Sequence, residues 1–125
     1  MESKFLTDLI IKNLETDEQS WELLSILSYQ SLLYNGIITV PSGFVTDLAS
    51  TGIFRKRCHR ESITHDYCYQ THIVSKKLAD KIFLEAMNSR KKPFYIRWTY
   101  YIAVKLFGFN AYRTGKERFT VLNSK

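Results

Sequence analysis

Two consecutive helix patterns occupy residues 62–90, SITHDYCYQTHIVSKKLADKIFLEAMNSR. The first runs from Ser62 to about Val74 and contains neither glycine nor proline. Ser75 is a good N-cap residue for the second, which continues to about Arg90. Basic residues at positions 90–92 suit the negative end of that helix. The two helices are short and consecutive, so we expect them to pack against each other.

A third helix is expected after Pro93, which suits a first helical turn, and is expected to end at Gly108. Apolar residues surround it almost completely, which indicates burial on several sides or cover by a partner. We interpret it as core packing. A helix lying on a membrane is disfavoured because the polar face is too narrow. Homo-oligomerisation through the helix over residues 93–108 is an open alternative. The apolar residues are Phe94, Tyr95, Ile96, Trp98, Tyr100, Tyr101, Ile102, Val104 and Leu106.

The first half of the chain favours β-strands over helices. Residues 5–14 and 21–29 are rich in Leu, Ile, Phe and Tyr, and the polar residues 17–20 separate them. Asn35-Gly36 predicts a turn before the β-branched run at residues 37–40. The chain is therefore expected to be α+β, with an N-terminal antiparallel β-meander followed by three packed helices. A length of 125 residues predicts a single domain over residues 1–125.

The net charge of +6 is unevenly distributed. Residues 1–50 have a balance of −5, and residues 51–125 have a balance of +11. A basic half suits an anionic membrane surface, an acidic protein or nucleic acid. A solvated basic surface without a partner is the favoured interpretation. Nucleic acid ranks last, because aromatic residues are not interleaved with the basic clusters at residues 55–57 and 90–92.

The N-terminus does not resemble a signal peptide, because Asp8 interrupts its apolar run. No stretch of about 20 apolar residues predicts a transmembrane helix. We therefore expect the host cytoplasm after synthesis, with incorporation into a virion as an open alternative. Cys58 and Cys68 are expected to be reduced, because ten residues on one helix separate them by about 15 Å.

The densest group of reactive side chains lies in residues 58–72. On a helix, His65, Tyr69 and His72 share one face, whereas Asp66 points about 100° away. His65 is a candidate general base, which needs a carboxylate to fix its tautomer. Asp80 on the next helix is the expected donor of that carboxylate. Asp66 is then available for a cation or a polar substrate group.

Each of these residues also has a purely structural explanation. A helical His is usually a satisfied surface or core residue, Tyr69 suits a core, and Asp80 suits the first turn of a helix. The combination of His65, Asp66, Tyr69 and Asp80 is what indicates a site. Zinc is the weaker alternative. Cys58, His65, Cys68 and His72 are acceptable ligands, but their spacing does not bring them to one ion.

Four motifs in order resemble a family of small phage and prophage proteins that is known only as a domain of unknown function. They are Gly43–Ser50, Thr64–Tyr69, Ala79–Met87 and Tyr101–Gly108. The resemblance implies a phage or prophage origin and no established activity. A role in a virion, tail or assembly intermediate, in contact with other phage structural proteins, is compatible with it.

The central segment also resembles the helix pair of phospholipase A2. That family carries His-Asp-x-Cys-Tyr, which residues 65–69 match, and an Asp on the next helix, which Asp80 matches. The resemblance implies that His65 is the general base, Asp80 orients it, Tyr69 supports the pair and Asp66 binds calcium. The glycine-rich calcium loop of that family is absent. The nearest candidate is residues 41–50, so calcium has less support than the His-Asp pair.

Residues 46–50 offer three further candidates. Asp47 is a candidate second metal ligand, and Ser50 and Thr46 are candidates to line the same pocket as His65. Alternatively, Asp47 and Ser50 cap a turn. A Ser50 nucleophile would complete a triad with His65 and Asp80, although no nucleophile-elbow pattern is present.

Two functional hypotheses follow. The first is an esterase or phospholipase A2-like hydrolase whose water is activated by His65. The second is a non-catalytic virion, tail or assembly component that uses the fold as an interaction module. The sequence leaves open whether the protein is an enzyme.

Overall fold

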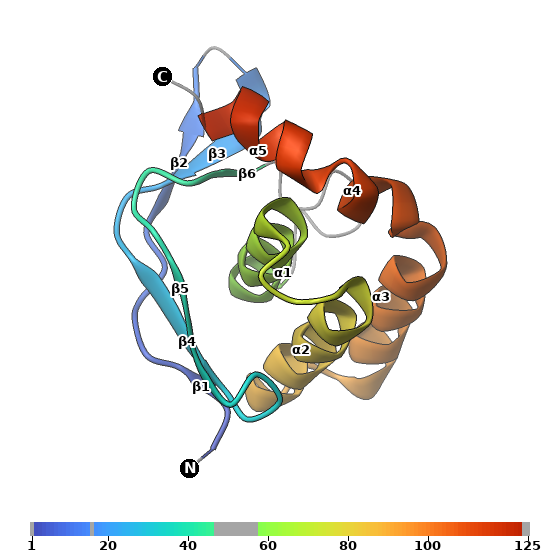
Figure 1. Ribbon diagram of the computed structural model, residues 1–125. Coiled ribbons are helices and arrows are strands. Elements are labelled where there is room, and N and C mark those ends of the chain that lie inside the picture. Colours follow the sequence, from blue (N-terminus) through green and yellow to red (C-terminus); the bar gives the residue numbers. More distant parts are fainter. Residues whose placement is uncertain (1, 16, 47–57, 124–125) are drawn as a thin grey trace.

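The computed structural model describes residues 2–15, 17–46 and 58–123, which form strands on one side of a central helix and further helices on the others (Figure 1). The strands are β1 (Lys4–Phe5), β2 (Ile11–Leu14), β3 (Asp17–Leu23), β4 (Leu27–Ser31), β5 (Gly36–Val40) and β6 (Val45–Thr46). The helices are α1 (His59–Thr71), α2 (Lys76–Ser89), α3 (Phe94–Phe107), α4 (Phe109–Arg113) and α5 (Gly115–Asn123). Helix α1 lies in the middle of the fold (Figure 1).

The α+β class is confirmed, with antiparallel strands preceding three main helices. The strands form two three-stranded sheets, in the orders β1-β4-β5 and β2-β3-β6. Each long strand predicted for residues 5–14 and 21–29 is divided into two strands that belong to different sheets. The prediction of a polar break at residues 17–20 is wrong. These residues begin β3, in which Asp17 pairs with Leu14 and, after an irregularity, Trp21 pairs with Asn13.

The β4–β5 hairpin confirms the turn predicted at Asn35-Gly36. Asn35 has a φ of 60°, a left-handed conformation that asparagine tolerates, and its amide donates to the Leu32 carbonyl at 3.1 Å. Alternate residues of β4 are buried, as a period of two requires for a strand with one inner face. Tyr29 on that face packs in the same core cluster as Cys68 and Tyr69 of α1. The hairpin is thus attached to the central helix.

The boundaries of the main helices are close to those predicted. Ser75 caps α2, because its Oγ accepts a hydrogen bond from the Leu78 amide at 3.2 Å. Helix α1 ends at Thr71 rather than near Val74, because His72 adopts a left-handed conformation with a φ of 55°. Cys58 and Cys68 are both buried and free. Burial, with a contribution from Asp66, raises the pKa of the Cys68 thiol to about 12.

The interpretation of α3 as a core helix is wrong for most of its surface. Tyr100 and Val104 are its buried residues, and they pack with Phe83 and Met87 of α2. The outer side of α3 is largely apolar and exposed. An unbroken apolar pattern does not indicate which side of a helix is covered. Among the described residues, no helix is long and apolar enough to cross a membrane.

Two short helices, α4 and α5, follow Gly108, which was expected only to end α3. Both close on α1. A Cβ on Gly108 would lie 2.6 Å from the Tyr69 hydroxyl, and one on Gly115 would lie 1.9 Å from the Tyr69 carbonyl oxygen. These glycines therefore permit a backbone approach that any other residue would prevent.

Candidate active site

The carboxylate of Asp80 is the centre of a buried hydrogen-bond network between α1 and α2. His65 Nε2 lies 2.9 Å from Asp80 Oδ1, and the Tyr69 hydroxyl donates to the same oxygen at 2.5 Å. Lys76 Nζ donates to the other oxygen, Oδ2, at 2.8 Å. His65 and Asp80 are 3% and 2% exposed. The structure thus brings together the three residues expected to be catalytic, His65, Asp80 and Tyr69.

Helical spacing places these side chains. His65 and Tyr69 are four residues apart on α1, and Lys76 and Asp80 are four residues apart on α2, so each pair shares one face. The imidazole of His65 packs between two rings, with centroid distances of 4.1 Å to Tyr69 and 4.6 Å to Phe83. These contacts fix the orientation of the imidazole, and Nε2 is directed to the carboxylate.

The charge of Asp80 is stabilised by its partners. Burial alone would raise the pKa of its carboxyl group. The hydrogen bond and electrostatic interaction with His65, followed by the hydrogen bonds of Lys76 and Tyr69, outweigh burial and hold the pKa below its ordinary value. Asp80 is therefore an ionised acceptor at neutral pH, and Nε2 of His65 is the donor in their hydrogen bond. An anion at this place stabilises a positive charge on the imidazole.

Lys76 is the member of the network that the sequence reasoning missed. Its ammonium group also donates to the carbonyl oxygens of Val104 and Lys105 at 3.0 and 3.2 Å, at the end of α3. The sequence does contain a signal for this contact, because Lys76 and Asp80 have the i, i+4 spacing of a helical ion pair. One cation therefore joins the His65–Asp80 pair to the C-terminal end of α3.

Asp66 belongs to a second buried network, on another side of α1. Its Oδ2 accepts hydrogen bonds from the Thr46 hydroxyl at 2.5 Å and from Gln70 Nε2 at 2.8 Å. Thr46 is thus beside α1, as a pocket residue would be, and it contacts Asp66. Gln70 was not predicted, although it lies four residues from Asp66. Asp47 and Ser50, the other candidates, lie outside the described residues.

In the part of the chain that is described, two hydrogen-bond donors engage Asp66 Oδ2. Calcium requires six to eight oxygen ligands, whereas Thr46 and Gln70 offer hydrogen-bond donors to Asp66. Across residues 2–15, 17–46 and 58–123, no group of three or more His, Cys, Asp or Glu side chains is placed to hold a metal ion.

His72 does not join the network, although helical spacing placed it on the face of His65 and Tyr69. It follows the last residue of α1, and its Nε2 lies 2.5 Å from the Tyr112 carbonyl oxygen. Its ring stacks on Tyr112 at a centroid distance of 4.0 Å. The two histidines considered as zinc ligands, His65 and His72, are thus each engaged with a different partner.

Residues 21–104 match the model of a protein family described as "Protein of unknown function (DUF1353)". The match covers more than half of the chain, so the protein belongs to this family. It includes the whole of α1 and α2, and therefore all four residues of the Asp80 network. A search of curated proteins and a search of solved structures each found no match.

Proposed function

We propose that this member of the DUF1353 family is a hydrolase that cleaves an ester, in a lipid, with His65 as its general base. The single observation that carries the proposal is the hydrogen bond of 2.9 Å between His65 Nε2 and Asp80 Oδ1. A histidine whose one nitrogen is fixed by a carboxylate can accept a proton at its other nitrogen. The resemblance of the flanking motifs to phage proteins supports a phage or prophage origin as part of the same proposal.

The proposed reaction uses His65 and its partners as follows. Nδ1 of His65 accepts a proton from a water molecule while the water oxygen bonds to the ester carbonyl carbon. Asp80 stabilises the resulting imidazolium, and Tyr69 and Lys76 keep the carboxylate in place. The same proton then passes to the leaving alcohol oxygen as the carbon–oxygen bond breaks. The products are a carboxylic acid and an alcohol.

The test is hydrolysis of a short-chain phospholipid at a concentration at which it is monomeric, so that the result does not depend on membrane binding. We expect fatty-acid release by the wild type and a loss of roughly 10²–10⁴-fold in His65→Ala, which is the usual contribution of a general base. The matched control is His72→Ala, which removes a histidine that contacts Tyr112 rather than Asp80. Circular dichroism shows whether each variant is folded.

Four outcomes separate the possibilities. Unchanged release in His65→Ala, or no release by the wild type, contradicts the proposal. Release that persists in a chelator agrees with the donor set around Asp66. Release that requires calcium would instead show that Asp66 ligates a cation.

A second candidate function is a non-catalytic virion, tail or assembly component. The near-complete burial of both His65 and Asp80 favours it, because a buried ion pair can serve the fold alone. Its test is the protein content of purified particles. Presence there, together with no ester hydrolysis by the wild type, would establish this function in place of the first.

A further inference from the structure

The outer side of α3 carries a continuous row of exposed apolar residues. Phe94, Trp98, Ile102 and Leu106 recur at every fourth position and cover about 18 Å of the helix. We call these four residues the α3 row. All four are exposed, Phe94 to 67% of its surface, and Tyr95, Phe107 and Phe109 adjoin them. A contiguous exposed patch of this kind marks a surface that binds another body.

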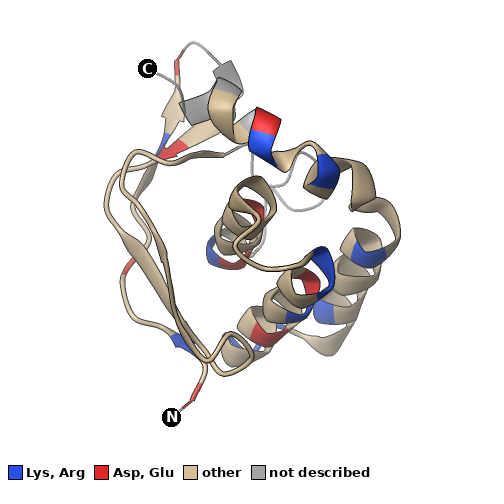
Figure 2. Cartoon of the chain, in the orientation of Figure 1, with Lys and Arg blue, Asp and Glu red and all other residues tan. Residues whose placement is uncertain are grey.

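Positive charges predominate around the α3 row. Residues 86–116 contain seven Lys and Arg residues and no Asp or Glu. Basic segments recur along α2, α3 and α4 in Figure 2. The basic residues are Arg90, Lys91, Lys92, Arg97, Lys105, Arg113 and Lys116. The occupant of this surface should therefore be negatively charged as well as apolar.

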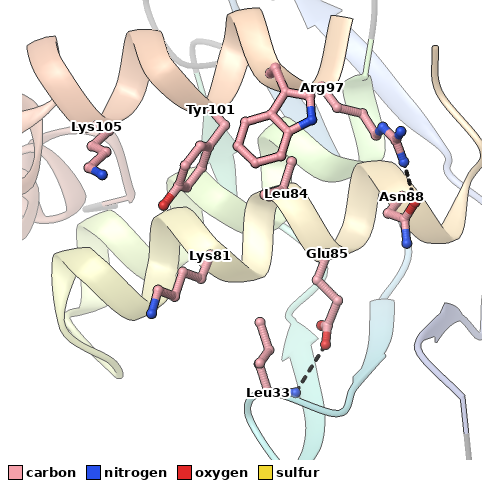
Figure 3. A pocket seen from close by; sticks show the side chains of 9 residues that line it. Leu33, Lys81, Leu84, Glu85, Asn88, Arg97, Tyr101 and Lys105 are labelled. Carbon is pink, nitrogen blue, oxygen red and sulfur yellow. Dashed lines mark hydrogen bonds between the residues drawn. The ribbon is translucent and has the colours of Figure 1, made fainter. Parts of the chain in front are cut away.

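A groove of about 720 Å³ between α2 and α3 borders the row and shares Trp98 with it. In Figure 3, Lys81 and Lys105 extend from the two helices at one end of the groove, and Arg97 lies at the other. The carboxylate in the lining, that of Glu85, accepts hydrogen bonds from the β4–β5 hairpin. The groove is lined by Leu33, Lys81, Leu84, Glu85, Asn88, Arg97, Trp98, Tyr101 and Lys105.

We infer that the α3 row and the basic groove beside it dock the protein on the surface of an anionic lipid bilayer. The row enters the boundary between headgroups and acyl chains, where Trp, Tyr and Phe are favoured. Lys81, Arg97 and Lys105 lie beside it, at the level of the lipid phosphates. Charge complementarity disfavours a symmetric contact between two copies through this side, because residues 86–116 contain no Asp or Glu.

The narrow polar face of α3 does not oppose this inference. A helix that lies alone on a membrane needs a wide polar face toward water. Here the opposite side of α3 packs on α2 through Tyr100 and Val104. The rest of the protein, rather than a polar helix face, therefore lies between α3 and water. The strands also expose apolar residues, such as Ile37, but residues 1–50 have a balance of −5 and would be repelled.

The experiment is co-sedimentation with vesicles of phosphatidylglycerol and phosphatidylcholine, and with vesicles of phosphatidylcholine alone. We expect binding to the anionic vesicles that weakens as salt rises, and at least tenfold weaker binding to the neutral ones. Trp98→Ser with Ile102→Ser should weaken binding at least tenfold. Lys81→Gln with Lys105→Gln should weaken it roughly thirtyfold, because each basic residue near an anionic surface contributes roughly fivefold.

Matched controls keep the result specific. Ile37→Ser removes an equally exposed apolar side chain on β5, and Lys4→Gln removes an exposed charge on β1, so both should bind as the wild type does. In a Trp21→Phe background, the fluorescence of Trp98 should shift to the blue on vesicle addition. His65→Ala should bind unchanged, which separates docking from hydrolysis.

Several results would overturn the inference. They are equal binding to neutral and anionic vesicles, no binding by the wild type, and no effect of the Trp98 and Ile102 substitutions. A dimer in sedimentation velocity that those same substitutions dissolve would assign the row to a second copy instead. Binding to DNA without binding to vesicles would assign the basic groove to nucleic acid.

Discussion

Asp80 of α2 holds His65 of α1 through a hydrogen bond of 2.9 Å, although fifteen residues separate the two along the chain. The turn between Thr71 and Lys76 reverses the chain, so that the two helices pack side by side (Figure 1). The pair is almost completely buried, and Asp80 has three side-chain donors. The stability of the protein should therefore respond to any change in this carboxylate.

Acid should remove the contribution of Asp80 to stability. Its pKa is lowered from the ordinary value of 3.8 in the folded protein, so its contribution is fully present above that value. The contribution is lost as the pH falls through the folded pKa, below 3.8. We expect the difference in unfolding free energy between wild type and Asp80→Asn to shrink as the pH falls below about 4. Urea unfolding at each pH measures it. A difference that did not change with pH would contradict the assignment.

Lys76→Met should destabilise the fold by about 2–4 kcal/mol. The substitution leaves Asp80 with one cationic partner fewer and leaves two carbonyl oxygens at the end of α3 without their donor. Lys77→Met is the matched control, because Lys77 is the exposed neighbour on the same helix. Its effect should stay within about 0.5 kcal/mol. Equal effects of the two substitutions in thermal unfolding would show that the network adds nothing to stability.

Glu85→Ala should release the β4–β5 hairpin from α2. The carboxylate accepts hydrogen bonds from the hydroxyl groups of Tyr29 and Ser31 and from the amide of Leu33, at 2.8, 2.7 and 3.0 Å. We expect a loss of about 2–4 kcal/mol, because the buried Tyr29 hydroxyl loses a charged acceptor. Hydrogen exchange at the Leu33 amide should accelerate more than exchange in α1.

The control for that substitution is Glu22→Ala. Glu22 forms an ion pair with the exposed Lys12 at 3.8 Å, and such pairs contribute at most about 1 kcal/mol. If Glu85→Ala costs no more than Glu22→Ala, the hairpin is held by its apolar contacts and not by this carboxylate.

The sequence predicted the His65–Asp80 pair because both residues lie on helices with clear signals, and a short turn leaves few ways to pack such helices. The hydrogen bond from Thr46 to Asp66 was beyond prediction. Thr46 lies on a two-residue strand, and no local pattern tells which helix a short strand will meet. The contacts of Glu85 with the hairpin could not be predicted either, because fifty or more residues separate the partners along the chain.

The apolar pattern of α3 predicted a helix correctly and its burial wrongly. Hydrophobic periodicity reports which faces of a helix are apolar, whereas burial depends on what else the chain brings to that face. The short helices α4 and α5 were not predicted, because Gly108 indicates the end of α3 and carries no signal for a helix after it. Gly108 and Gly115 let two helices approach Tyr69.

Gly115→Ala should be strongly destabilising. An added Cβ would lie 1.9 Å from the backbone carbonyl oxygen of Tyr69, so α5 would have to move away from α1. We expect a cost of about 3 kcal/mol or more. Gly36→Ala is the control, because a Cβ there meets only the Tyr34 side chain at 3.6 Å, and its cost should be about 1 kcal/mol or less. Thermal unfolding compares the two. A mild effect of Gly115→Ala would mean that α5 contributes little to the fold.

The hydrogen bonds of Lys76 connect the buried site to α3. One ammonium group holds both the carboxylate of Asp80 and the last turn of α3. If displacing that turn also moved the Lys76 ammonium group, the electrostatic potential at Asp80 and His65 would change. Thermodynamic linkage would then require the reverse with the same coupling free energy, so a proton gained or lost by the buried pair would alter the energy of holding α3 in place. Lys76 thus provides a physical connection between the end of α3 and the buried His65–Asp80 pair.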